Sequence, residues 1–494
     1  MYTLRIAAAV LVTATTVVAV GAAPSSATPT GTGLGTTAIS AKGRWLVEAD
    51  GRVVVMHGLN QVFKVPPYTP DADGFGDDDA AFLQTNGFDA MRVGLIWAAV
   101  EPTPGHYDDA YLASIAGTVQ TLASHGIVSV LDFHQDLYNE KFQGEGAPAW
   151  AVQDGGLPNP PLGFPYNYLG NPAEWHTWDQ FWKNAPAPDG VGLQTHYANM
   201  WRHVAAYFNN NAAVAGYEIM NEPFAGTLWE QCAVLFVGCP LFENGKLDPF
   251  YVRVADAIRL ADTSHTVWFE PQVLFTQVDA TSVGPINDPH SVLAFHDYCS
   301  TEAVTGNNTL CPPQDDLTVA TAVRRANALG VPAVMTEFGA TNDLPNISDM
   351  VTRNDKQRIG WLEWAYTGND KTSASPNGQA LVLDPSQSPS GANVLTAKLK
   401  TLAEPYPQVV AGNPTAWQFA NGQFTLSYST TRVGTLTRFA AGSETDIAVP
   451  AIQYPGGYVV SVTGGHVISA PNAPLLRVVS NAGAATVKVL VTAA

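Results

Sequence analysis

The sequence predicts an α/β protein, a (β/α)8 barrel of the TIM type followed by an antiparallel β-sandwich. Two observations predict the barrel: eight short apolar segments alternate with helix-compatible segments between residues 41 and 403, and polar side chains follow nearly every apolar segment. A third observation predicts the sandwich, because residues 404–494 hold short alternating runs separated by turns rich in Gly, Asn and Pro.

The first 27 residues are predicted to be a signal peptide. A single early charge, Arg5, precedes an apolar run over residues 6–23, and small residues follow at 25–27. Cleavage after Ala23 or Ala27 satisfies the preference for small residues. A retained membrane anchor is the alternative, but three threonines dilute the run. We therefore expect a secreted protein with a Thr/Gly/Pro-rich linker over residues 28–40.

The apolar segments are predicted to be barrel strands. Each is nearly continuous in apolar character, as a strand buried on both faces of a parallel sheet requires. The predicted strands are Val53–Asn60, Ala90–Trp97, Val128–Asp136, Val214–Glu222, Thr266–Gln272, Val292–Tyr298, Ala333–Gly339 and Leu362–Tyr366.

Helices are predicted between these strands. They include Asp109–His125, Thr195–Asn209, Pro249–Thr263 and Leu317–Leu329. Glycine follows the first and the last of them, at positions 126 and 330, as is typical after a helix carboxyl terminus. The βα units over residues 41–403 leave room for long loops, so we expect an enlarged barrel.

The tail from residue 404 to 494 is predicted to be a separate β-sandwich domain. Its alternating runs are short, and few helix signals remain. The predicted strands are Gln423–Tyr428, Gly434–Phe439, Gly457–Val462, Leu475–Val479 and Thr486–Val491. The domain is predicted to brace the barrel or to bind carbohydrate or membrane.

The charge of the chain restricts its partners. The formal net charge is −19, with 46% hydrophobic and 14% charged residues. These values are typical of a globular protein. They argue against nucleic-acid binding, which needs clustered Lys and Arg, and against electrostatic docking on anionic membranes.

The four cysteines fall into two local pairs. Three connectivities are possible, and the short intervening loops favour Cys232–Cys239 and Cys299–Cys311. Disulfides suit an exported protein. Metal ligation is the weaker alternative, because no Cys-x-x-Cys or His-x-x-x-His spacing accompanies the cysteines.

Two carboxylates at predicted strand ends point to glycoside hydrolysis. Glu222 ends the fourth predicted strand in an Asn-Glu-Pro sequence, and Glu337 ends the seventh in Thr-Glu-Phe-Gly. Barrel enzymes carry their active sites at the carboxyl ends of the strands, so both side chains are expected at one mouth. A retaining glycosidase needs two carboxyls about 5–5.5 Å apart. We predict Glu222 as the acid/base and Glu337 as the nucleophile; ordinary polar strand ends are the alternative.

Other polar residues at the strand ends are predicted to support this pair. Arg92 would keep Glu337 ionised and Tyr298 would orient it. Asn221 is expected to bind the sugar 2-hydroxyl, and Trp364 to offer a flat face to the sugar ring. His134 and His296 would bind sugar or support the catalytic groups.

Three further carboxylates are predicted to be non-catalytic. Glu218 lies four residues before Glu222 on the same strand and is expected in the barrel core. Glu270 and Glu101 are predicted to be support residues at most.

These residues resemble the signature of family 5 glycoside hydrolases over residues 41–403. The resemblance rests on Arg92, His134, Asn221-Glu222-Pro223, His296, Tyr298, Glu337 and Trp364. It implies the retaining mechanism with the roles given above for Glu222 and Glu337.

Within that family the chain resembles the actinobacterial endoglycoceramidases. The likeness lies in residues 63–68 (FKVPPY), 132–136 (DFHQD) and 144–150 (GEGAPAW). It implies a glycosphingolipid substrate, cut between oligosaccharide and ceramide, with Lys64, Asp136 and Trp178 binding the adjoining sugar. The related endogalactosylceramidases share this core, so the first sugar stays open.

Two other functions are alternatives to this one. An endo-β-glucanase acting on cellulose or mannan would use the same carboxylates, but its aromatic residues would line a long open cleft. A non-catalytic sugar- or lipid-binding protein is disfavoured by the intact Glu222 and Glu337 pair. No metal ion or cofactor is expected, since the carboxyls and sugar contacts suffice, and we expect a monomer.

An apolar stretch follows the predicted acid/base strand. Residues 233–237 (AVLFV) lie between Cys232 and Cys239. An exposed apolar patch beside a site marks a binding surface, so we expect Leu235 and Phe236 to contact ceramide or a membrane surface. Packing against a neighbouring loop is the alternative.

Overall fold

The computed structural model describes residue 34 and residues 38–299, 301–302, 308–368 and 376–494. The predicted signal peptide, and the predicted linker apart from residues 34 and 38–40, lie outside the described residues. In the part that is described, no helix has the length and apolar character needed to cross a bilayer.

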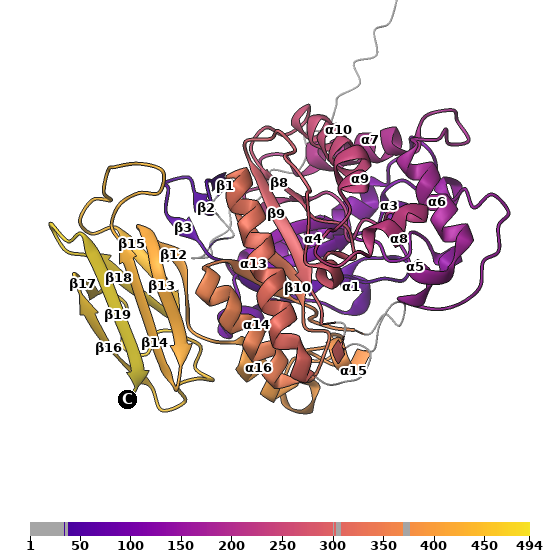
Figure 1. Cartoon of the computed structure of the whole chain (residues 1–494). Helices are drawn as coiled ribbons and strands as arrows, with labels where there is room; N and C mark the ends of the chain where they lie inside the picture. Colours follow the sequence, from indigo (N-terminus) through magenta and orange to yellow (C-terminus); the bar gives the residue numbers. More distant parts are fainter. Residues whose placement is uncertain (1–33, 35–37, 300, 303–307, 369–375) are drawn as a thin grey trace, which may run out of the picture.

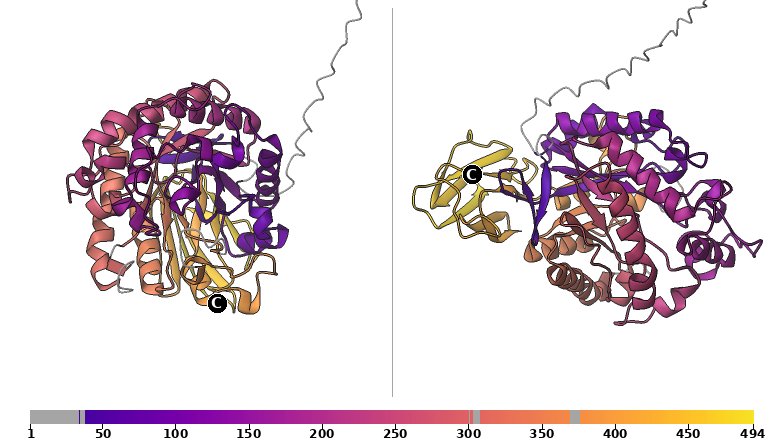
Figure 2. Two further views of the ribbon diagram at one scale, coloured as in Figure 1. Left: turned by 90° about the vertical axis from the view of Figure 1, so that its right-hand side faces the viewer. Right: turned by 90° about the horizontal axis from the view of Figure 1, so that it is seen from above.

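Eight parallel strands close into a barrel, which confirms the predicted fold class (Figures 1 and 2). Each strand pairs with its successor in the chain, and the last pairs with the first. The strands are β4 (His57–Gln61), β5 (Ala90–Leu95), β6 (Val128–Phe133), β7 (Val214–Glu218), β8 (Thr266–Phe269), β9 (Ser291–Asp297), β10 (Ala333–Phe338) and β11 (Gly360–Glu363).

Helices surround the barrel and bury its outer face. The Asp108 side chain caps the amino terminus of α4 (Asp109–Ser124). Gly126 (φ 75°) follows the carboxyl terminus of this helix, as predicted. The longer helices are α2 (Asp77–Thr85), α4 (Asp109–Ser124), α6 (Pro172–Trp182), α7 (Leu193–Phe208), α10 (Asp248–Arg259), α13 (Cys311–Leu329), α14 (Leu344–Gln357) and α16 (Thr396–Leu402).

The interior of the barrel is layered. Alternate residues of a strand face the interior, and those near the amino-terminal ends of the strands are apolar, for example Ala90, Val130 and Ala294. The next inward positions along the same strands are Arg92, Asp132 and His296, all of them buried. The apolar layer thus closes the lower part of the barrel, and polar groups meet above it.

The first predicted strand divides between two sheets. Residues 53–54 form β3 (Val53–Val54), which pairs with β12 (Tyr406–Val410), whereas residues 57–61 form the barrel strand β4. A continuous apolar run does not reveal such a break, because both strands are buried.

The carboxyl-terminal region forms two packed antiparallel sheets beside the barrel (Figure 1). The larger sheet also takes in the amino-terminal strands β1 (Ile39–Lys42), β2 (Trp45–Glu48) and β3. Its other strands are β12, β15 (Glu444–Ala448), β18 (Leu475–Ser480) and β17 (Gly465–Val467); the second sheet holds β13 (Asn413–Ala420), β14 (Gln423–Ser429), β19 (Thr486–Ala493) and β16 (Tyr458–Thr463).

One predicted sandwich strand is wrong. Residues 434–439 form a turn and loop, in which Gly434 has a φ of 67° and Leu436 is fully exposed. The strand in this part of the sheet is β15, whose half-buried Asp446 pairs with Arg52 of the amino-terminal segment. The charged residues of β15 hid it from the sequence pattern.

Candidate active site

Arg92 is the centre of the polar layer in the barrel. It extends from β5, has no exposed surface, and donates to Glu337 Oε1 at 2.6 Å and to Asn221 Oδ1 at 2.9 Å. Its remaining partners are Glu218 (2.8 Å), Asp132 (3.0 Å) and Asn60 (3.0 Å). Although burial opposes the charge, Asp132, Glu218 and Glu337 raise the pKa of Arg92 well above its usual value. A permanent cation therefore lies beside Glu337.

Glu337 reaches this cation because β10 contains a β-bulge. The pairing with β9 shifts between Met335 and Glu337, so Thr336 and Glu337 together face one partner residue. Thr336 donates to Glu218 inside the barrel, and Glu337 also points inward. The second oxygen of Glu337 accepts from the Tyr298 hydroxyl at 2.9 Å. Arg92 and Tyr298 hold the carboxylate from two sides, as the sequence predicted.

Glu222 lies just beyond β7, in a left-handed backbone conformation with a φ of 43°. Its Oε1 is 2.9 Å from His296 Nδ1. One oxygen of Glu222 and one of Glu337 lie within 4.8 Å of each other and of a His296 nitrogen. The Glu222 and Glu337 side chains are 12% and 6% exposed, whereas Arg92 is not exposed at all. Both carboxyls therefore reach the surface of the site, whereas Arg92 lies beneath them.

The surroundings of Glu222 favour its protonated form. Burial and the neighbouring Asp136 raise the pKa of Glu222 to about 7. Burial also lowers the pKa of His296 to about 4, so this imidazole is neutral. The environment thus keeps a proton on one carboxyl, while a cation and a hydroxyl hold the other.

A second ionic cluster adjoins the pair. Lys64, from the loop after β4, bonds to Asp136, lies 3.7 Å from Glu145, and places its ammonium over the Trp364 ring at 4.5 Å. Although burial opposes it, Lys64 together with His134 lowers the pKa of Asp136 below its usual range. Gly144 permits this packing, because a Cβ there would lie 1.8 Å from the Asp136 main-chain oxygen. Hydrogen-bonding groups for a sugar thus surround the carboxyls.

His134 belongs to both clusters. Its Nδ1 is 2.8 Å from Asp132, which also pairs with Arg92, and its ring stacks on Trp364. Trp364 follows β11 and is 5% exposed. Of the predicted site residues, the structure brings together Lys64, Arg92, His134, Asp136, Asn221, Glu222, His296, Tyr298, Glu337 and Trp364.

Trp178 lies differently from the prediction. It is on α6, its side chain is fully buried, and it packs against Tyr138, Trp182 and Phe224. It reaches only the wall of a small internal cavity that His134 also lines. An accessible sugar contact by Trp178 is therefore not present in this structure, because the aromatic cluster covers the indole.

Three residues of the site were not predicted from the sequence. Asp132 joins Arg92 to His134, Glu145 faces Lys64, and Gln135 donates its amide to the main-chain oxygens of Asn221 and Glu222 at 2.9 Å. All three lie in the motifs around residues 132–136 and 144–150. Their position inside these motifs was the sequence feature that could have indicated a role in the site. The direction of their side chains depends on the conformation of the loops, which the sequence pattern does not show.

Several acidic and histidine side chains in the described residues lie close enough to hold a metal ion. The triplets are His134, Asp136 and Glu145; Glu218, Glu270 and His296; and Glu222, His296 and Glu337. Arg92, Lys64 and histidine already engage most of these carboxylates. We assign none of the triplets as metal ligands.

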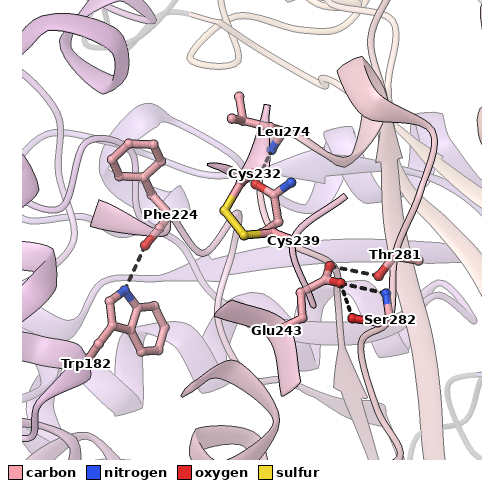
Figure 3. The surroundings of a disulfide bond; sticks show 9 residues. Trp182, Phe224, Cys232, Cys239, Glu243, Leu274, Thr281 and Ser282 are labelled. Atoms are coloured by element: carbon pink, nitrogen blue, oxygen red, sulfur yellow. Dashed lines mark hydrogen bonds between the residues drawn. A yellow bond between two sulfur atoms is a disulfide. The ribbon is translucent and has the colours of Figure 1, made fainter. Parts of the chain in front are cut away.

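The two predicted disulfides are confirmed as Cys232–Cys239 and Cys299–Cys311. Figure 3 shows the first, with Glu243 beyond it bonded to Thr281 and Ser282. The loop that it closes follows β7 and α8 (Trp229–Cys232). Leu235 and Phe236 at its tip are 53% and 64% exposed. Their side chains are therefore not buried by the neighbouring loop, although the Phe236 N–H donates to the Val278 main-chain oxygen of that loop at 2.7 Å.

The site combines a carboxyl that favours its proton with a second carboxyl that arginine and tyrosine hold, and their oxygens lie within 4.8 Å. At the carboxyl-terminal mouth of a (β/α)8 barrel, this pair defines a glycoside hydrolase. The chain belongs to glycosyl hydrolase family 5. Residues 47–370 match the cellulase domain of that family, and residues 405–491 match the family 5 C-terminal domain.

The chain is similar to endoglycoceramidases along most of its length. It is 32% identical over 475 residues to endoglycoceramidase I of Rhodococcus hoagii (strain 103S), covering 92% of this chain and 88% of that protein. Two structures of endo-glycoceramidase II from Rhodococcus sp. each cover 91% of this chain and 99% of that one. The lactosyl-enzyme intermediate is 29% identical with a TM-score of 0.75, and the ganglioside GM3 complex is 27% identical with a TM-score of 0.74.

Proposed function

We propose that this enzyme is a retaining endo-β-glycosidase that hydrolyses the bond between oligosaccharide and ceramide in glycosphingolipids. The observation that carries the mechanism is the separation of Glu222 and Glu337, whose oxygens approach within 4.8 Å. An inverting enzyme keeps its carboxyls about 6.5–9.5 Å apart to admit a water molecule.

In the proposed mechanism Glu337 attacks the anomeric carbon while Glu222 protonates the oxygen of ceramide. Ceramide leaves, and a glycosyl–Glu337 ester remains. Glu222, now ionised, takes a proton from water, and this water attacks the same carbon and releases the oligosaccharide and Glu337. The lactosyl-enzyme intermediate of the Rhodococcus sp. enzyme supports this route.

The lipid part of the proposal rests on the relatives. The protein from Rhodococcus hoagii is an endoglycoceramidase, and the Rhodococcus sp. structure is a complex with ganglioside GM3. The ionic cluster of Lys64, Asp136 and Glu145 supports the sugar part, since it supplies polar groups beside the carboxyls.

A substrate comparison tests this function. We expect oligosaccharide release from a lactosyl- or gangliosyl-ceramide and none from carboxymethyl-cellulose, measured by chromatography of the labelled glycan. Release from carboxymethyl-cellulose alone would instead identify an endoglucanase.

The pH dependence should follow the proton on Glu222. Glu222 must be protonated to act as the acid, and its pKa is raised to about 7. We therefore expect kcat/KM for a glycosphingolipid to fall above pH 7, about tenfold per pH unit at the limit. A dinitrophenyl glycoside needs no protonation of its leaving group and should lack this alkaline limb. The same limb with both substrates would contradict the assignment of Glu222.

We further infer that an apolar surface near the site receives ceramide or a membrane. Exposed apolar side chains occur in the loops after the neighbouring strands β6 and β7, where Trp175 and Trp229 join the two loops. They are Leu157, Leu162, Phe164, Tyr166 and Leu169 in one loop, and Val234, Leu235, Phe236, Val237 and Leu241 in the other. Groups of this kind mark a binding surface.

Replacing both Leu235 and Phe236 by Ser should lower hydrolysis of glycosphingolipid in vesicles by at least about tenfold. Full burial of one such side chain contributes roughly 1.5–3 kcal/mol, and a factor of ten requires only about 1.4 kcal/mol. Hydrolysis of a soluble aryl glycoside should stay unchanged. Leu260→Ser is a matched control, because Leu260 is 77% exposed and follows α10, which leads to the opposite end of the barrel. Equal losses on both substrates would contradict a lipid contact.

Export is part of the proposed function. The apolar amino terminus supports it, as do the two disulfides, which persist in oxidising compartments. Amino-terminal sequencing of the protein from culture medium would test it, with cleavage expected after residue 23 or 27. We propose that the exported enzyme is a monomer, which its sedimentation would test.

A further inference from the structure

Glu270 makes two contacts with residues of the active site that the proposed mechanism does not use. It comes directly after β8 and is buried, and its main-chain oxygen accepts from the Tyr251 hydroxyl of α10 at 2.9 Å. Its carboxyl lies between the Glu222 main chain and the His296 ring. Glu270 therefore connects β8 and α10 to the catalytic carboxyl on the neighbouring loop.

The first contact is with the main chain of Glu222. The N–H of Glu222 donates to Glu270 Oε1 at 2.8 Å. Residue 222 is in the left-handed region, which a non-glycine residue occupies only where its surroundings hold it. Gln135 holds the carbonyl side of this turn through two hydrogen bonds, and Glu270 holds the amide side.

The second contact is with His296. Oε2 of Glu270 is 3.5 Å from His296 Nε2, a buried nitrogen that makes no hydrogen bond within the described residues. On the other side of the ring, Nδ1 is 2.9 Å from Glu222 and 3.5 Å from Glu337. A neutral imidazole has one N–H and one lone pair, so the group at Nε2 decides what Nδ1 presents to Glu222.

The charges around Glu270 favour a neutral carboxyl. Burial and Glu218 raise the pKa of Glu270 well above its usual value, Arg92 opposes this, and Glu222 adds to it. Burial keeps His296 neutral as well. A proton on Oε2 would leave Nε2 as the lone-pair side of the ring that faces it, and Nδ1–H would then be directed at Glu222.

We propose that Glu270 is a positioning residue for Glu222, holding its main chain in the left-handed conformation and orienting His296 so that Nδ1–H faces its carboxyl. This inference rests on the proposed acid/base role of Glu222. The Glu270 carboxyl bonds to the main chain of Glu222 and not to its carboxyl, so it acts through Glu222 and His296.

Two substitutions at position 270 test the inference. Glu270→Ala removes both contacts, whereas Glu270→Gln keeps an acceptor for the Glu222 N–H and an N–H donor for Nε2. Glu243→Gln is the matched control. Glu243 is also buried and bridges to a neighbouring loop through Thr281 and Ser282 (Figure 3), and the hydrogen bonds of its side chain among the described residues go to those two residues and not to the site.

We expect Glu270→Ala to lower kcat/KM for a glycosphingolipid about 10- to 100-fold, because this leaving group needs an acid. The kcat/KM for a dinitrophenyl glycoside, whose leaving group needs no acid, should change less than about threefold. The alkaline limb near pH 7 should also move. Glu270→Gln and Glu243→Gln should each keep the wild-type limb and activity within about threefold.

Equal losses on both substrates with an unmoved pH profile, or no loss in Glu270→Ala, would overturn the inference. Glu222→Gln, measured alongside, separates this failure from that of the proposed function. If Glu222→Gln loses more activity on glycosphingolipid than on the dinitrophenyl glycoside and Glu270→Ala does not, only the inference about Glu270 is wrong. If neither variant shows this difference between the two substrates, the acid/base assignment of Glu222 is wrong too.

Discussion

Glu337→Ser is expected to abolish hydrolysis of glycosphingolipid, with kcat falling by at least about 10³-fold. Serine is too short to reach the anomeric carbon from β10, and it removes the negative charge that Arg92 and Tyr298 hold in place. Binding of the oligosaccharide should persist, because Lys64 and Asp136 are untouched. Single-turnover kinetics and calorimetric titration with the product glycan would measure the two effects separately.

The stereochemistry of a rescue reaction gives a sharper readout. Azide admitted to the space left by Glu337→Ser should attack the anomeric carbon of a dinitrophenyl β-glycoside directly, expelling dinitrophenolate and giving the α-glycosyl azide. Full hydrolytic activity of this variant, or a β-glycosyl azide as product, would refute the assignment of Glu337 as nucleophile. An unchanged thermal unfolding midpoint would show that the fold is intact.

Glu222→Gln is expected to reduce kcat/KM for glycosphingolipid by about 10²- to 10⁴-fold, the usual contribution of a general acid. Glutamine keeps the size of the side chain and its contact with His296, but it has no proton to transfer. With a dinitrophenyl glycoside, formation of the glycosyl–Glu337 ester should remain fast while its hydrolysis is slow. We therefore expect a burst of dinitrophenolate equal to the enzyme concentration.

For a smaller variant, Glu222→Ala, azide should restore turnover and give the β-glycosyl azide. It would attack the covalent intermediate, so two inversions leave the configuration unchanged. The opposite configurations from Glu222→Ala and Glu337→Ser assign the two roles in one pair of experiments. Without a burst from Glu222→Gln, another residue would have to be the acid.

The periodicity of the sequence was sufficient for the architecture. Continuous apolar segments require strands buried on both faces, and helices between them leave a closed parallel barrel as the arrangement that buries every strand. The same logic located Arg92, Glu222, His296 and Glu337, because polar groups at the ends of such strands must meet at one mouth. Close spacing also sufficed for both disulfides.

Strand parity could not predict which side chains face inward. A bulge in β10 places Thr336 and Glu337 on the same side, and a similar shift in the pairing of β6 with β7 lies near Ala215. Strict alternation would separate Thr336 from Glu337. Bulges depend on the pairing of two strands, which no single segment of sequence encodes.

The sequence also did not predict which way side chains point in the segments between the barrel strands. Trp178 was predicted to contact sugar but is enclosed by Tyr138, Trp182 and Phe224, whereas Gln135 and Glu270 hold the main chain of Glu222. Motif membership says that such residues are near the site, but not which way they point. The amino-terminal strands in the sandwich sheet were missed because β3, which joins them to that sheet, pairs with β12, more than 350 residues away in the chain.

For the catalytic pair, the sequence by itself determined that two glutamates end strands of one barrel, because strand order and polarity are local properties. Only the tertiary structure decided that their oxygens lie within 4.8 Å and that Arg92 and Tyr298 donate hydrogen bonds to Glu337. It also decided that burial and the neighbouring Asp136 raise the pKa of Glu222 to about 7. Distance and desolvation arise from groups far apart in the chain, and they give two identical side chains different surroundings.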